Sequence, residues 1–107
     1  MLPFPITQTK SQIMRAAKID RNQPEIVEAL RRVGASVIPM HTAGAGFPDL
    51  VVGFRGVTYL IEVKDGEKPP SARKLNKLQQ AWHAKWQGHK AVANDVPEAL
   101  RIIGAIK

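Results

Sequence analysis

The sequence predicts an α/β domain with the element order αβββαβ, in which helices flank a mixed four-stranded sheet. Two adjacent segments, residues 49–54 and 57–64, alternate apolar and other side chains as the strands of a β-hairpin do. A helical pattern at residues 71–87 separates this hairpin from a further strand. Such a crossover makes the last strand parallel to its neighbour.

The chain before the hairpin predicts a helix and an edge strand. The helix is expected over residues 22–34, with Glu25 forming a capping box with Asn22. Its buried face would hold Ile26, Val27, Leu30 and Val33. Residues 35–40 follow as a strand, and Pro39 predicts that this strand lies at an edge of the sheet.

The loop of the hairpin determines which side chains face each other. If Arg55–Gly56 is a two-residue loop, Phe54 faces Val57 at the end of the hairpin. The same register sets Asp49 opposite Glu62, whereas a three-residue loop or a bulge would break it. The two carboxylates would then have β-carbons about 5 Å apart.

One face of the hairpin is continuously apolar, and the other ends in charges. The apolar face comprises Leu50, Val52, Phe54, Val57, Tyr59, Ile61 and Val63, and it must be buried. Lys64 lies on the same face as Asp49 and Glu62, at the charged end. Opposed carboxylates repel unless a cation lies between them, so this pattern favours a metal site. The alternative is an ordinary charged sheet end, with Lys64 paired to one of the acids.

The second half of the chain predicts two helices around a fourth strand. A long helix over residues 71–87 would begin at a Ser71 cap and end at a glycine. Residues 90–94 form the fourth strand, and Asp95 caps the last helix. The long helix has an apolar stripe, assigned to packing, of Leu75, Leu78, Trp82 and Trp86.

Composition indicates one compact basic domain. The chain has 107 residues, a formal net charge of +7 and no cysteine, which excludes disulfides and a thiol nucleophile. No acid occurs between Glu67 and Asp95, a stretch that holds many of the cations, so a polyanion is the expected partner. The cations expected to bind DNA are Lys68, Arg73, Lys74 and Lys77. A solvated basic helix face is the alternative.

Several segments occur in an order known from a nuclease family. Residues 46–49, the hairpin and residues 62–64 resemble the motif of PD-(D/E)XK nucleases. The longer pieces resemble VRR-NUC domains, especially small stand-alone members from phages and prophages, and the layout is similar to that of archaeal Holliday junction resolvases. These pieces are QPEIVEALRRVGASV, GFPDLVVGFRG, YLIEVKDG and the later L-x-x-x-Q-x-x-x-H.

The resemblance implies a restriction-endonuclease-like core and a site for Mg²⁺ or Mn²⁺. Asp49, Glu62 and Lys64 would be catalytic, and the metal would be held by Asp49, Glu62 and the backbone carbonyl of Val63. Gln79 matches a helical glutamine that faces the active site. Its alternative role is a core-edge glutamine bonded to the backbone.

The first helix departs from the family pattern. Related nucleases place a glutamate there that reaches the metal, and the alignment puts Gln23 in that position. Helical phase favours Gln23 over Glu25 and Glu28, which turn away from the inward face. Either the site has one carboxylate fewer, or Gln23 contributes its amide oxygen or a bound water.

The sequence therefore predicts a metal-dependent DNA endonuclease that selects branched, flap or Holliday-junction-like structures. A non-catalytic DNA-binding module with a decayed nuclease site is the alternative. Residues 1–19 are interpreted as a basic arm or dimer contact and residues 20–107 as the nuclease domain, acting as a homodimer. We expect a cytoplasmic location, in a bacterial or phage-infected cell, because no apolar run is long enough to span a membrane.

Overall fold

The computed structural model describes residues 19–40 and 42–107, and within them it has the predicted αβββαβ order. The expected N-terminal arm lies almost wholly outside these residues. The elements are helix α2 (Gln23–Arg32), strands β1 (Ser36–Pro39), β2 (Leu50–Phe54) and β3 (Val57–Val63), a 3₁₀ helix (Pro70–Arg73), helix α3 (Lys77–Lys85), strand β4 (Lys90–Ala93) and helix α4 (Val96–Ile102).

The four strands form one mixed sheet in the order β1-β2-β3-β4. The first three are antiparallel and β4 is parallel to β3, as the crossover predicts. The predicted hairpin register is confirmed, since Phe54 pairs with Val57 and Leu50 pairs with Ile61. Both loop residues have positive φ, 51° at Arg55 and 82° at Gly56, which matches the twist of a tight hairpin.

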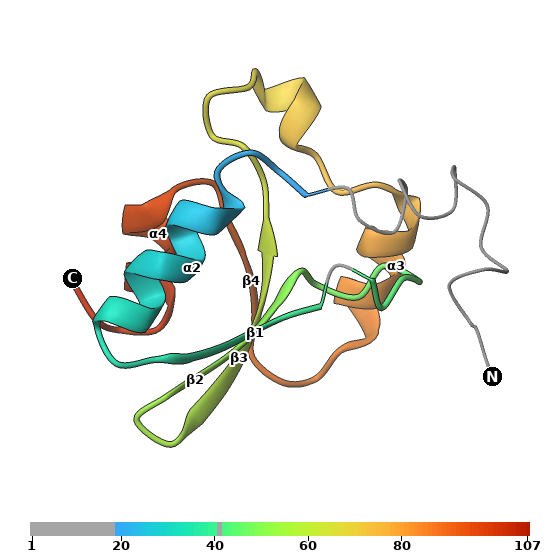
Figure 1. The fold of residues 1–107 in the computed structure, drawn as a ribbon. Coiled ribbons are helices and arrows are strands. Elements are labelled where there is room, and N and C mark those ends of the chain that lie inside the picture. Colours follow the sequence, from blue (N-terminus) through green and yellow to red (C-terminus); the bar gives the residue numbers. More distant parts are fainter. Residues whose placement is uncertain (1–18, 41) are drawn as a thin grey trace, which may run out of the picture.

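The core lies between one face of the sheet and the helices α2 and α4 (Figure 1). The predicted apolar face of the hairpin supplies its centre, and Leu50, Val52, Ile61 and Val63 are fully buried. Helix α2 adds Ile26, Val27 and Leu30, and α4 adds Ala99. Val33 was expected in this set, but it is exposed, because the helix ends at Arg32.

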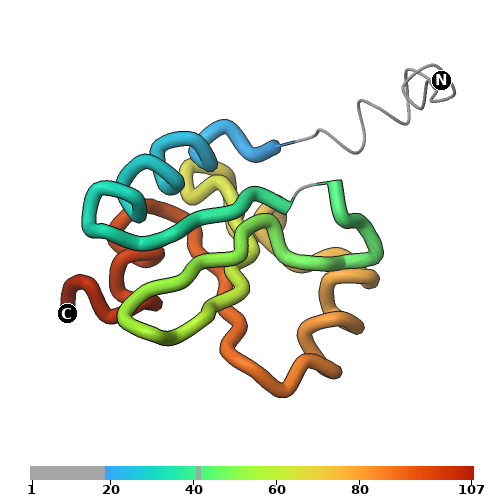
Figure 2. The backbone as a smooth tube through the Cα atoms, turned by 60° about the horizontal axis from the view of Figure 1, so that its bottom comes forward, coloured from blue at the N-terminus to red at the C-terminus, as the bar shows by residue number. Residues whose placement is uncertain are grey.

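The other face of the sheet is covered only in part. Helix α3 lies on that side, next to the loop that leads into β2 (Figures 1 and 2). Leu60 is buried there, whereas Val51 and Gly53 are half-buried and Thr58 is exposed. The charged end of this face is therefore left open beside α3.

The predicted long helix over residues 71–87 is wrong. The chain forms the short 3₁₀ helix, is extended at Lys74, and starts α3 at Lys77 with Asn76 as its cap. The Asn76 side chain accepts from the Gln79 N–H, and the Gln79 side chain accepts from the Asn76 N–H. This capping box was present in the sequence as Asn-x-x-Gln, and it is a stronger start signal than Ser71.

Candidate active site

Asp49, Glu62 and Lys64 come together in an open pocket of about 410 Å³ at the charged end of the hairpin. We call it the carboxylate pocket. Its wall comes from the segment before α2, the loop before β2, the end of β3 and the first turn of α3. The residues that line it are Asp20, Gly44, Gly46, Phe47, Asp49, Glu62, Lys64, Lys68, Ala72, Asn76, Leu78 and Gln79.

The Asp49 side chain continues the sheet where the backbone ladder stops. The last backbone pair of β2 and β3 is Leu50 with Ile61, so the next positions along the same register are Asp49 and Glu62. Asp49 Oδ2 accepts a hydrogen bond of 2.8 Å from the Val63 N–H. This bond holds one carboxylate oxygen against β3 and explains how an aspartate is tolerated at this position.

Glu62 is the most enclosed acid of the pocket, with 3% of its surface exposed. Its Oε2 accepts from Gln79 Nε2 at 2.8 Å and lies 3.7 Å from the Lys64 ammonium. Its Oε1 is buried and has no hydrogen-bond partner among the described residues. A buried carboxylate oxygen without a donor is costly, so this atom is available to a cation.

Gln79 connects Glu62 and Lys64. Its Oε1 accepts from Lys64 Nζ at 3.0 Å while its Nε2 donates to Glu62. The same Oε1 also accepts from the Asn76 N–H at 2.9 Å, which is part of the capping box of α3. The start of α3 therefore fixes Gln79, and Gln79 orients Lys64 against Glu62. Gln79 thus has the backbone bond of the alternative role and, in addition, bonds to both charged side chains.

The electrostatics of the pocket disfavour two ionised carboxylates. Burial first, and the neighbouring charge of Asp49 after it, raise the pKa of Glu62 to about 8 against the opposing charge of Lys64. Burial also raises the pKa of Asp49, although the hydrogen bond from the Val63 N–H opposes this shift. The pair is thus poised to share a proton or to bind a cation in its place.

A third carboxylate, Asp20, was missed by sequence reasoning. It lines the pocket from the turn before α2, where its backbone carbonyl accepts from the Gln23 N–H at 2.9 Å. Its side chain is 28% exposed and lies 4.0 Å from the Lys68 ammonium. Its charge raises the pKa of both Asp49 and Glu62. A usable signal existed, because Asp20 is the first acid in the chain and precedes the helix expected to carry the missing ligand.

Among the residues that the structure describes, neither Gln23 nor Glu25 lines the carboxylate pocket. Gln23 opens α2 and is buried, with its Oε1 lacking a hydrogen-bond partner in the described part of the chain. Glu25 is exposed and lines a different pocket. A role for Gln23 through its amide oxygen stays a prediction. The acid near α2 that lines the pocket is Asp20, in the turn before the helix.

The oxygen atoms present fit a hard divalent cation. Asp49 and Glu62 offer carboxylate oxygens, one of them the unpartnered Oε1. Within residues 19–40 and 42–107, no three acids or histidines gather closely enough to hold a metal alone. Further ligands would thus be a carbonyl, water or phosphate. The continued register sets Pro48 opposite Val63, and proline has no N–H to donate to the Val63 carbonyl.

The loop before β2 is packed tightly against the start of α3. Gly46 has a φ of 82°, and a side chain there would overlap the Leu78 carbonyl. Phe47 meets the Trp82 ring edge-on, with centroids 5.5 Å apart and an interplanar angle of 72°. These contacts close one wall of the pocket, and only glycine permits the close approach at residue 46.

The predicted DNA-binding residues lie on the rim and just beyond it. Lys68 lines the pocket beside Asp20. Arg73 is half-buried, because its Nε donates to the Lys68 carbonyl at 2.8 Å. Lys74 and Lys77 are exposed on the approach to α3 and at its first residue. The cations therefore surround the start of α3, where the pocket opens.

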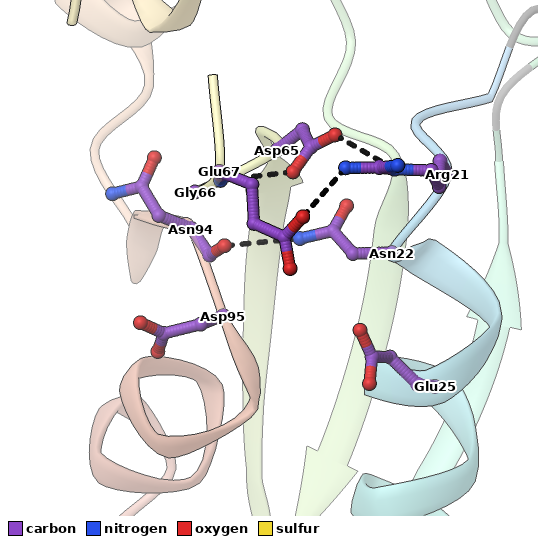
Figure 3. A pocket seen from close by; sticks show the side chains of 8 residues that line it. All are labelled: Arg21, Asn22, Glu25, Asp65, Gly66, Glu67, Asn94 and Asp95. Atoms are coloured by element: carbon purple, nitrogen blue, oxygen red, sulfur yellow. Dashed lines mark hydrogen bonds and ion pairs between the residues drawn. The ribbon is translucent and has the colours of Figure 1, made fainter. Parts of the chain in front are cut away.

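A second polar cluster lines a separate pocket (Figure 3). We call it the anchor, and it consists of Arg21, Asn22, Asp65 and Glu67. Arg21 Nε lies 3.3 Å from Asp65 Oδ2, and Arg21 Nη2 lies 2.7 Å from Glu67 Oε1. The Glu67 N–H donates to Asp65 Oδ1 at 3.0 Å. These partners, with the backbone N–H contributing most, lower the pKa of Asp65.

Asn22 joins three segments of the anchor. Its Nδ2 donates to the Lys64 carbonyl at 3.0 Å and to the Asn94 carbonyl at 2.9 Å. The expected capping box between Asn22 and Glu25 is wrong, because the Asn22 side chain makes no cap hydrogen bond. The amide is used instead to hold the segment before α2 against the ends of β3 and β4. This contact brings the segment that contains Asp20 next to the end of β3, where Lys64 lies, and both residues line the carboxylate pocket.

No family model, curated protein or solved structure matches the chain. The similarity to a nuclease motif therefore depends on the residues themselves. In the part of the chain that the structure describes, no helix is long and apolar enough to cross a membrane.

Proposed function

We propose that the protein is a metal-dependent DNA endonuclease of the PD-(D/E)XK type, resembling VRR-NUC domains. One observation carries this proposal: Asp49, Glu62 and Lys64 meet in an open pocket, and Gln79 bonds to both Glu62 and Lys64. An ordinary charged sheet end would satisfy its acids with cations. Here Lys64 lies 3.7 Å from one oxygen of Glu62, but the other oxygen is buried beside a second acid and has no hydrogen-bond partner in the described part of the chain.

The chain's own residues would bind the metal and position the reactants. Asp49 and Glu62 would hold Mg²⁺ or Mn²⁺ together with the Val63 carbonyl, and Asp20 would add negative charge at the rim. The bound cation would polarise the phosphate and lower the pKa of water. Lys64, oriented by Gln79, would donate to the attacking water or to the phosphate oxygen that gains charge.

Hydrolysis forms a bond from a water oxygen to phosphorus and breaks the bond from phosphorus to one sugar oxygen. The attacking water gives up one proton to solvent, and the leaving sugar oxygen takes up one proton, so the step balances. The basic residues Lys68, Lys74 and Lys77 would contact the phosphate backbone, which fixes its position without reading bases. A small domain with one site would cut two strands as a homodimer.

Incubation of purified protein with branched and linear DNA tests this proposal. Cleavage is expected with Mg²⁺ or Mn²⁺ and none with EDTA, and Lys64→Ala should remove it. DNA binding without cleavage under every metal condition would favour the alternative, a non-catalytic DNA-binding module.

The dependence of binding on salt tests the proposed DNA track. Each neutralised phosphate contributes about −0.9 to the slope of log affinity against log salt concentration. Changing Lys74 and Lys77 together to Gln should flatten that slope. An unchanged slope would place the DNA on another surface.

A further inference from the structure

The apolar side of α3 lacks the cover that a core helix has. Leu78, Trp82 and Trp86 follow at intervals of four residues from its first turn to its C-cap. None of the residues of α3 is buried. Leu78 is 63% exposed and Trp86 is 41% exposed, so the expected assignment to packing is wrong for these two residues, whereas Leu75 and Trp82 are half-buried. The reason is that α3 packs on the loop before β2 rather than flat on the sheet.

The aromatic rings form a row that starts at the carboxylate pocket. Phe47, which lines the pocket, meets the edge of Trp82. Trp82 in turn stacks on Trp86, with centroids 5.2 Å apart and an interplanar angle of 15°. Leu78 lies at the pocket end of the same side of α3. The row thus leads from the pocket to an exposed indole at the far end of the helix.

The charges around this row select its partner. Both tryptophans of the row lie in the stretch between Glu67 and Asp95, which contains no acid. Lys74, Lys77 and Lys85 are exposed beside or within α3. Aromatic rings that stack on bases, set beside cations that follow the phosphates, are how proteins bind single-stranded nucleic acid without reading its sequence.

A second copy of the chain fits this surface less well. The core of an interface between copies is depleted of charged residues, and a two-fold axis would bring the same patch of each copy together. Lysines of two α3 helices would then face one another. The surface favours a polyanion over its own copy.

We propose that Trp86, supported by Trp82, is a stacking platform for an unpaired base of single-stranded or branched nucleic acid whose backbone leads into the carboxylate pocket. The choice of substrate rests on the proposed nuclease function, whereas base stacking by the two tryptophans does not need it. Duplex ends or junctions with unpaired bases would be held by the platform. A fully paired duplex would make only the phosphate contacts.

Intrinsic fluorescence reports this platform directly, because Trp82 and Trp86 are the only tryptophans of the chain. Titration with oligo(dT) in EDTA should quench the emission, and a blunt duplex of equal charge should quench it less. Trp86→Ala should weaken oligo(dT) binding by about five-fold to a hundred-fold, the range for removal of one base–aromatic contact. Trp86→Phe should retain much of the affinity.

Two controls separate stacking from charge and from folding. Ile38→Ala removes an apolar side chain that is more exposed than Trp86, from the edge strand β1, and should leave binding unchanged. Lys85→Gln should weaken binding while the quenching at saturation stays. If Trp86→Ala does not fold, as judged by circular dichroism, Leu78→Ala takes its place and should weaken oligo(dT) binding. Ile38→Ala should leave binding unchanged, and Trp86→Phe should retain much of the affinity.

Three outcomes would overturn the inference: no quenching by oligo(dT), equal quenching by the blunt duplex, or a Trp86→Ala protein that turns from dimer to monomer with unchanged oligo(dT) affinity. The last would assign the surface to a second copy. Quenching in EDTA without cleavage in Mg²⁺ would overturn the nuclease proposal and leave the platform standing. Cleavage with no effect of Trp86→Ala on binding would do the reverse.

Discussion

The carboxylate pocket and the anchor share two segments of chain, residues 20–22 and 62–68, yet the acids in the two places have opposite surroundings. Alternation along β3 and beyond sends Glu62 and Lys64 to one side and Asp65 to the other. In the anchor, Asp65 is 3% exposed and is bonded by Arg21 and a backbone N–H. In the pocket, Glu62 is as deeply buried, and one of its oxygens has no donor.

The difference separates stability from function. Pairing lowers the pKa of Asp65, whereas burial beside Asp49 raises the pKa of Glu62. A buried group whose charge is paired stabilises the fold, whereas a group in a cleft with a strongly perturbed pKa is a candidate for a functional site. The anchor also positions two residues of the pocket. Asn22 bonds the carbonyl of Lys64, and Asp20 lies two residues before Asn22 in the chain.

The largest expected effect is on the cleavage rate of variants in the carboxylate pocket. Lys64→Ala should lower the cleavage rate by about 10²–10³-fold, the cost of removing one charge-stabilising donor, and Glu62→Gln should lower it at least as much. DNA binding should change little, because the phosphate contacts lie elsewhere. Asp65→Asn is the matched control and should impair folding more than turnover, as measured by rate assays beside thermal melts. Equal loss of binding and cleavage in Glu62→Gln would indicate misfolding instead.

The pH dependence of stability should have opposite signs at the two places. The folded pKa of Glu62, about 8, exceeds the ordinary value of 4.5, so metal-free stability should fall as pH rises from about 4.5 to 8. Each pH unit between the folded and unfolded pKa corresponds to about 1.4 kcal/mol, so the loss over the whole window is on the order of 5 kcal/mol.

Asp65 behaves in the opposite way. Its folded pKa is lowered, so its contribution is present above the ordinary value of 3.8 and is lost as pH falls through the folded pKa. Urea unfolding across pH should show that Glu62→Gln removes the fall toward pH 8 and that Asp65→Asn removes the acid-side loss. A parent protein with flat stability between pH 5 and 8 would contradict the burial of an ionisable Glu62.

The anchor itself can be divided into buried and exposed parts. Asn22→Ala would remove the side-chain donor to the Lys64 carbonyl and one of the two donors to the Asn94 carbonyl, which keeps the Gly66 N–H. It should cost about 1–3 kcal/mol of unfolding free energy. Arg21→Gln removes a side chain that is 70% exposed and should cost less than about 1 kcal/mol. Denaturant melts measure both. An Arg21 variant that loses more than the Asn22 variant would show that the ion pairs, not the amide, hold the segment.

The smallest effect sharpens the comparison within the pocket. Asp49→Asn keeps an acceptor for the Val63 N–H and removes the charge opposite Glu62. The variant should be more stable in EDTA by about 0.2–1 kcal/mol, the size of a cross-strand pair, and should lose cleavage. Mg²⁺ should then raise the melting temperature of the parent more than that of the variant. Lower stability in EDTA, with equal responses to Mg²⁺, would mean that the two acids share no cation.

Local patterns in the sequence determined the sheet and the three residues at its charged end. Alternation with a period of two, together with a two-residue loop at Arg55–Gly56, allows one register, and a slip would bury the charges and expose the apolar face. The crossover between β3 and β4 made the last strand parallel. The N-cap of α4 at Asp95 was predicted for the same local reason, since its side chain bonds the Glu98 N–H.

Contacts between distant segments decided what the pocket contains. Asp20 reaches the end of β3 only because Asn22 bonds the Lys64 carbonyl, 42 residues further along the chain. Gln79 links Glu62 and Lys64 because α3 is capped by Asn76. Trp86 stays exposed because α3 packs on the loop before β2, where Gly46 contacts Leu78. Periodicity and capping act over a few residues and say which face of an element is apolar. They do not say which other segment meets that face, because long-range packing alone sets those distances.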